Sequence, residues 1–147
     1  MRITLEVQRT LDLEVAARTP RRLFLYRLMT RVRFRQSSGW SDYHTAIIDT
    51  GAPYSLIPIS LWPALSITRL CAMPVRGIVP GAAAELDAIL ARVTGQLLDA
   101  THRSPRLPLG AMLADTDKVP LILGWSGCLD RAKLVLDAPR HRAWLEF

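Results

Sequence analysis

The residues best suited to do chemistry form the triplet Asp49-Thr50-Gly51, which directly follows the apolar run Ala46-Ile47-Ile48. A carboxylate can take a proton from water and, once protonated, return it to a leaving amine. Two carboxylates that share one proton therefore supply a general base and a general acid together. Gly51 allows the backbone to turn tightly, and its amide is a suitable donor to the carboxylate. We therefore predict that Asp49 is the catalytic residue of a hydrolytic site.

The context of the triplet separates this hypothesis from an ordinary strand-end turn, which would use the same residue types. Beyond Gly51 the chain continues as Ala52-Pro53-Tyr54-Ser55-Leu56-Ile57-Pro58. A second segment, Leu121-Ile122-Leu123-Gly124, places apolar residues before a glycine that lies 75 residues after Asp49. A turn without a function would not require this second segment.

In order and spacing, the two segments resemble the active-site loop and the supporting strand of retropepsins. These are the single-lobe aspartic proteases of retroviruses and their cellular and bacterial relatives. The resemblance runs from about Leu28 to Phe147 and is most specific at residues 49–58. It implies an all-β, retropepsin-like acid-protease half-barrel with one or two short helices and an active site at a two-fold dimer axis. It also implies that Thr50 hydrogen-bonds to the partner loop, and that Leu123 and Gly124 support the catalytic loop.

A glycine-containing segment, residues 75–81, stands where retropepsins have the flap that closes over the substrate. Position 80 is proline, whereas viral flaps have glycines, which are conformationally freer, in this region. The resemblance implies that the substrate is a protein or peptide bound in an extended conformation. By position, the expected substrate-contacting residues are Ile48, Ala52, Gly77, Ile78 and Val79.

The chain holds one such aspartate, because no other aspartate is followed by Thr-Gly, and 147 residues leave no room for a second lobe. The second carboxylate must then come from a second copy, which predicts a homodimer. In retropepsins the chain ends of both subunits interleave into a small sheet. The resemblance therefore implies that residues 143–147, Ala-Trp-Leu-Glu-Phe, pair with the second chain. The alternative is that they close the domain's own core.

Other chemistry-bearing residues are scattered along the chain. Cys71 and Cys128 have no ligand or redox spacing, so we predict two buried thiols and no disulfide. The three histidines are isolated, which predicts no shared metal site. Residues 124–127, Gly-Trp-Ser-Gly, approach the serine-hydrolase motif, but position 128 is cysteine. The expected reaction needs neither a cofactor nor a metal.

The net charge of +6 comes mostly from arginine, and seven arginines fall within eighteen residues, at positions 18, 21, 22, 27, 31, 33 and 35. Such a cluster raises the possibility of a nucleic-acid site. However, Arg31, Arg33 and Arg35 alternate with Val32 and Phe34, as on the solvated face of a half-buried strand. The stretch matches no known nucleic-acid-binding motif, so the sequence favours the solvated face over nucleic acid.

The elements that must position these residues are short strands. Alternation predicts strands at Ile3–Val7 and Leu11–Val15, a longer strand through Phe34, and further strands at about 43–48, 89–98, 107–113, 120–124, 133–136 and 143–147. The helices of a doubly wound sheet are missing. We expect residues 23–147 to form the protease domain and residues 1–22 to be an N-terminal strand segment or a removable pro-segment.

No apolar run approaches the ~20 residues of a membrane span, and the amino terminus carries charges where a signal peptide would be apolar. With two unpaired cysteines, this predicts a cytoplasmic protein without a membrane contact. One rival hypothesis keeps the fold and drops the catalysis, leaving a dimerisation or nucleic-acid-binding module. The intact triplet argues against it.

Overall fold

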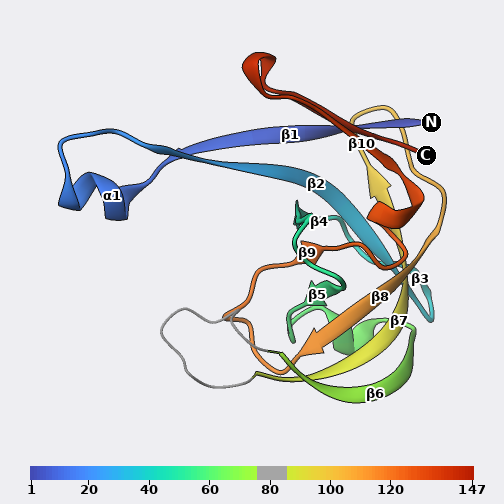
Figure 1. Cartoon of the computed structure of the whole chain (residues 1–147). Coiled ribbons are helices and arrows are strands. Elements are labelled where there is room, and N and C mark those ends of the chain that lie inside the picture. Colours follow the sequence, from blue (N-terminus) through green and yellow to red (C-terminus); the bar gives the residue numbers. More distant parts are fainter. Residues whose placement is uncertain (76–85) are drawn as a thin grey trace.

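The computed structural model describes residues 1–75 and 86–147, which form mainly β-strands (Figure 1). The strands are β1 (Arg2–Leu11), β2 (Phe24–Gln36), β3 (Gly39–Trp40), β4 (His44–Ile48), β5 (Ser55–Ile57), β6 (Ile67–Val75), β7 (Leu86–Leu98), β8 (Leu107–Ala114), β9 (Ile122–Leu123), β10 (Lys133–Asp137) and β11 (Arg142–Glu146). The helical segments are α1 (Leu13–Arg18) and three single 3-10 turns, η1 (Trp62–Ala64), η2 (Leu129–Arg131) and η3 (Ala138–Arg140). The prediction of an all-β chain is confirmed, with more brief helical turns than the one or two expected. In the described ranges, no helix is long and apolar enough to cross a membrane.

The strands of the described residues form one mixed sheet in the order β10-β11-β1-β2-β4-β9-β5-β8-β7-β6, with β3 beside β2. β2 also pairs with β7 over residues 31–34, opposite residues 98–95. This pairing closes β2, β4, β9, β5, β8 and β7 into a ring. The ring brings the short strands β4, β9 and β5 together, and these are the strands that hold the Asp49 loop.

The core lies inside the ring and is built by alternation along each strand. In β2, Val32 and Phe34 are fully buried, whereas Arg31 and Arg35 are exposed. The predicted inside-and-outside pattern of this strand is confirmed. The large, fully buried side chains of the same core include Leu97, Leu109, Leu113 and Leu123 from the other ring strands, and Ile3 and Leu145 from β1 and β11.

The amino-terminal segment contains one strand and one helix, so the prediction of a strand over Leu11–Val15 is wrong. Asp12 caps α1 by accepting a hydrogen bond from the Val15 backbone N–H at 3.0 Å. A capped turn followed by helix-forming residues outweighs five residues of alternation. The earlier strand, β1, lies between β11 and β2, and its Ile3 and Leu5 are buried in the core. A cleavage that removed residues 1–22 would strip β1 from between these two strands.

The carboxyl-terminal strand, β11, also lies inside the sheet, with a neighbouring strand on each side. β11 pairs with β1, where Leu145 faces Ile3, and with β10, where Leu145 faces Leu134. Leu145 is fully buried, and Ala143 is almost so. The expectation that residues 143–147 pair with a second chain is therefore wrong, because both edges of β11 already have partners. The alternative, that these residues close the domain's own core, is confirmed.

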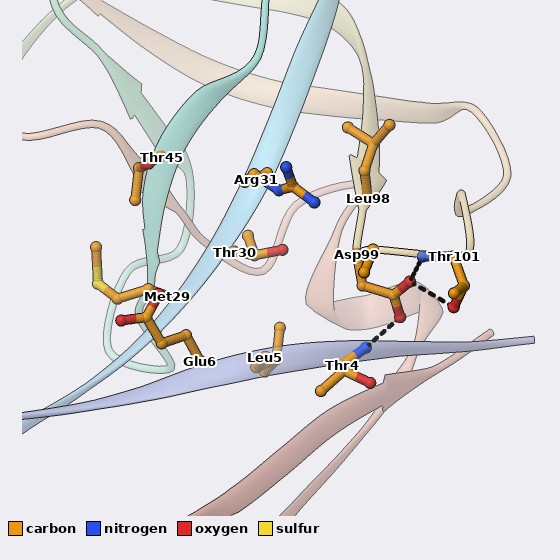
Figure 2. Close-up of a pocket in the computed structure, with 11 residues that line it drawn as sticks. Thr4, Leu5, Glu6, Met29, Thr30, Arg31, Thr45, Leu98, Asp99 and Thr101 are labelled. Atoms are coloured by element: carbon orange, nitrogen blue, oxygen red, sulfur yellow. Dashed lines mark hydrogen bonds between the residues drawn. The ribbon is translucent and has the colours of Figure 1, made fainter.

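Asp99 ties β1 to the turn between β7 and β8 (Figure 2). Its carboxylate accepts hydrogen bonds from the backbone N–H groups of Thr4 at 2.9 Å, Thr101 at 2.8 Å and His102 at 2.7 Å, and from the Thr101 hydroxyl at 3.2 Å. Burial alone would raise the pKa of Asp99, but these hydrogen bonds outweigh burial and hold the pKa well below its ordinary value of 3.8. The N-terminal strand is thus held by a charged acceptor as well as by its two neighbours.

Asp99→Asn is expected to lower the free energy of unfolding by about 1 to 2 kcal/mol near neutral pH, because an amide cannot replace a carboxylate that accepts at both oxygens. The folded-state pKa is depressed, so the contribution is fully present above the unfolded value of 3.8 and is lost as the pH falls through the folded value. Urea unfolding of both proteins from neutral to strongly acidic pH measures this. The two stabilities should converge in acid, and a difference independent of pH would contradict the assigned role.

Candidate functional site

Asp49 begins the loop that joins β4 to β5, at the point where the buried part of β4 ends. Its backbone N–H donates to the Leu123 carbonyl at 3.0 Å, and its Oδ1 accepts from the Gly51 N–H at 2.8 Å. The side chain is half-buried, whereas Thr50 and Gly51 are exposed. The carboxylate is therefore oriented by its own loop and remains within reach of a ligand.

β9 lies between β4 and β5 and holds both ends of this loop. It is parallel to β4, with Ile48 facing Leu123, and antiparallel to β5, with Leu56 facing Ile122. Beyond β9, the Trp125 N–H donates to the Ala52 carbonyl at 2.9 Å, and the Trp125 indole donates to the Thr50 carbonyl at 2.6 Å. The segment 121–124 thus runs directly beside the Asp49 loop.

Gly124 is required by the close approach of these two segments. A Cβ atom at this position would lie 2.5 Å from the carbonyl oxygens of both Ala52 and Tyr54, and neither backbone group can move away cheaply. The Gly124 N–H also donates to the hydroxyl of Ser55, which is fully buried, at 3.3 Å. Ser55 and Trp125 are supports that the sequence did not reveal, because their partners are distant backbone groups.

A cavity of about 390 Å³ adjoins Asp49 and is mainly lined by apolar side chains. Ala52, one of the expected substrate-contacting residues, lies in its wall. The larger apolar groups in the wall come from four different segments, with Leu56, Met73, Met112 and Ile122 among them. None of these four was expected from the sequence, since no local pattern distinguishes a cavity-lining apolar residue from a core residue.

Two groups of expected substrate-contacting residues are not found in this wall. Ile48 is buried in the core on the inner face of β4 and is not among the residues that line this cavity. Gly77, Ile78 and Val79 fall outside the described residues, and so does most of the expected flap. The described part of that hairpin, β6 with β7, contributes Met73 and Pro74 to the cavity.

Asp49 is the only carboxylate among the described residues that line this cavity. Comparisons of the chain with protein-family models, with curated proteins and with solved structures found no match. The chemistry of the site must therefore be argued from its own geometry. One oriented carboxylate beside an apolar cavity provides half of the acid and base pair that hydrolysis by water requires.

Other chemistries find less support near this loop. Cys128 is fully buried, and burial, together with the nearby charge of Asp130, raises the pKa of its thiol to about 12. A thiol that stays protonated is a poor nucleophile. Cys71 is exposed, so the prediction of two buried thiols is wrong for this residue. Within residues 1–75 and 86–147, no three His, Cys, Asp or Glu side chains are grouped to hold a metal ion.

Proposed function

We propose that this chain is one half of a homodimeric aspartic endopeptidase of the retropepsin type. The observation that carries the proposal is the half-buried Asp49 carboxylate, oriented by the Gly51 N–H at 2.8 Å beside a largely apolar cavity. The strand order around it adds support, because β9 runs between the two strands that flank the loop. This matches the supporting-strand arrangement that the sequence resemblance implies.

In the proposed reaction, two Asp49 carboxylates share one proton across the two-fold axis. One takes a proton from water as the water attacks the peptide carbonyl, and the other protonates the leaving amine. No covalent intermediate and no cofactor are needed. Thr50, exposed at the tip of the loop, is available for a hydrogen bond to the partner loop.

The substrate in this proposal is an extended peptide with an apolar side chain near the cleaved bond. The wall of the cavity supports this choice, because Leu56, Met73 and Met112 offer an apolar surface beside Asp49. Methionine side chains are flexible and polarisable, so they adapt to unbranched or aromatic groups. A charged side chain in this position would lose its hydration without a compensating partner.

The proposal is tested by incubating the purified chain with a peptide library and identifying the products by mass spectrometry. Cleavage that is blocked by a statine-type inhibitor, which mimics the tetrahedral intermediate, is the expected result. The same spectra show whether the chain removes its own N-terminal segment. Absence of cleavage by a chain proven to be dimeric would remove the proposed activity.

A second copy must approach the end of β4, and a projecting arm of the chain lies on that side. The arm consists of residues 8–27, which include the ends of β1 and β2 and all of α1. β4 ends where Ile48 faces Leu28, so the arm continues past the level of Asp49, as Figure 1 shows. Five large apolar residues of the arm are exposed, namely Leu13, Leu23, Phe24, Leu25 and Tyr26. We assign the dimer contact to this arm, since the terminal strand β11 has no free edge.

Leu25→Ser is expected to raise the dimer dissociation constant at least tenfold, because each copy loses an apolar contact worth roughly 1.5 to 3 kcal/mol when buried. Sedimentation velocity over a concentration series measures the constant. The matched control is Leu136→Ser, a leucine on β10 with 54% exposure, compared with 44% for Leu25. Equal effects of the two substitutions on the dissociation constant would contradict the assignment of the arm to the dimer interface.

A further inference from the structure

Outside the Asp49 site, the structure gathers arginines from three distant segments on the outer side of β2. Arg31 and Arg35 are exposed on this strand, and Arg33 between them is half-exposed. Arg106, just before β8, and Arg131, in η2, lie close to Arg35. These three guanidinium groups, with Thr94 and Pro108, line a pocket of about 430 Å³.

Three of the arginines on β2, at positions 31, 33 and 35, each lie near an aromatic ring supplied by β3 or by the turn that follows it. The guanidinium carbon of Arg33 is 4.7 Å from the Trp40 ring centre, and those of Arg35 and Arg106 are both 5.9 Å from it. Arg31 lies 6.0 Å from the ring centre of Tyr43, which is 49% exposed. The aromatic rings beside these arginines are thus provided by the tertiary structure, because Phe34 of the same strand is fully buried.

The positive charges of this surface have no acidic partners in the part of the chain that the structure describes. The ion pairs among the described residues involve Arg2, Arg18, His102, Lys133 and Arg140. None of these pairs involves the arginines around Trp40 or those in the pocket. Arg33 donates at 2.7 and 3.1 Å to the side-chain oxygen of Gln96, which is neutral. Like charges that converge without counterions repel one another, and an anionic ligand would relieve this repulsion.

We propose that this arginine–tryptophan surface binds single-stranded nucleic acid. The pocket formed by Arg35, Arg106 and Arg131 takes phosphate groups, since guanidinium forks match phosphate oxygens well. Trp40 gathers the guanidinium groups of Arg33, Arg35 and Arg106 around its ring, and Tyr43, which is 49% exposed, provides a face on which an unpaired base stacks. The aromatic rings favour a single strand over a duplex, whose bases are already stacked on one another. The site uses no residue of the Asp49 loop, so its test does not depend on whether the chain is a peptidase.

Fluorescence anisotropy with labelled 12-nucleotide oligothymidylate and oligouridylate tests the proposal, with the full chain and a series of salt concentrations. The double substitution Arg35→Gln with Arg106→Gln should weaken binding and reduce the slope of log affinity against log salt by about 0.7 for each arginine lost. The matched control is Arg140→Gln with Arg142→Gln, which removes the same charge from η3 and β11, outside both the arm and the Asp49 loop. The turn that joins β10 to β11 lies at the end of β10 that is remote from η2 (Figure 1). The control should leave affinity and slope nearly unchanged.

Tyr43→Leu should weaken binding about 5- to 100-fold at constant charge, because it removes the exposed stacking platform. Circular dichroism checks that this variant is folded, and the arginine pair carries the test if it is not. Three outcomes would overturn the proposal. The first is an equal loss in both arginine pairs, and the second is equal affinity for duplex DNA. The third is binding of heparin that is as tight as that of the oligonucleotides and is insensitive to the Tyr43 substitution.

Discussion

Asp49→Asn is expected to lower the rate of peptide cleavage at least about a hundredfold while the fold persists, because general acid and base catalysis contributes about 10² to 10⁴. The amide has nearly the same shape as the carboxylate, and its oxygen can still accept the Gly51 N–H that now reaches Oδ1 at 2.8 Å. The amide cannot share a proton with a second copy. Initial rates on a peptide identified from the library, measured at equal dimer concentration, give the effect.

The matched control is Asp130→Asn, since Asp130 is also an aspartate close to this region and is exposed in η2. This variant should cleave at a rate close to that of the parent chain. A rate for Asp49→Asn within tenfold of the parent would exclude Asp49 as the catalytic carboxylate. Mixing parent and variant chains adds a second check, because a heterodimer with one carboxylate should be inactive if both copies contribute to one site.

Leu145→Ala is expected to lower the free energy of unfolding by about 2 to 5 kcal/mol, the usual cost of truncating a buried leucine. Leu145 is fully buried between Ile3 of β1 and Leu134 of β10. Deleting residues 144–147 removes most of the central strand of this three-stranded part of the sheet. We therefore expect the deleted chain to lose cooperative unfolding, since domains are stable by only about 5 to 15 kcal/mol. Urea titration followed by circular dichroism measures both effects.

Leu136→Ala provides the control for this prediction, because Leu136 lies on the neighbouring strand β10 with 54% of its surface exposed. Its effect should stay within about 0.5 kcal/mol, as for most surface substitutions. A deletion variant that unfolds cooperatively and has lost only its dimer would contradict the pairing of β11 within the chain. Such a result would instead support the interleaved chain ends that the family resemblance implies.

Much of the site follows from patterns that extend over only a few residues. An apolar run that ends in Asp49-Thr50-Gly51 predicts a buried strand that delivers a carboxylate to a tight turn, and β4 and its loop have this form. The resemblance of residues 121–124 to a supporting strand implies that Gly124 lies beside the catalytic loop, and in the structure Gly124 approaches the backbone of Ala52 and Tyr54 closely. Alternation at 31–35 predicts one buried and one solvated face. Each of these features depends on local backbone geometry, and local geometry is encoded locally.

The same local patterns gave the wrong result where two structures compete for one segment. Residues 11–15 alternate like a strand, but Asp12 caps a helix that starts at Leu13. Residues 143–147 have the apolar alternation of a strand. That alternation does not indicate which other strand these residues pair with. The choice between β1 of the same chain and a second copy depends on where the first five residues lie, some 140 positions away.

The sequence by itself determined the β character of this chain, the position of the Asp49 carboxylate after a buried strand and the glycine beside it. Only the tertiary structure decided what surrounds them: the methionines of the cavity, the Trp125 indole on the Thr50 carbonyl, and the arginines that converge on Trp40. The physical reason is the closure of the strand ring. Side-chain alternation determines which face of a strand is buried, whereas the pairing of β2 with β7 and of β9 with both β4 and β5 determines which strands become neighbours and closes the ring. Residues far apart in sequence become neighbours through that closure, and no local pattern records it.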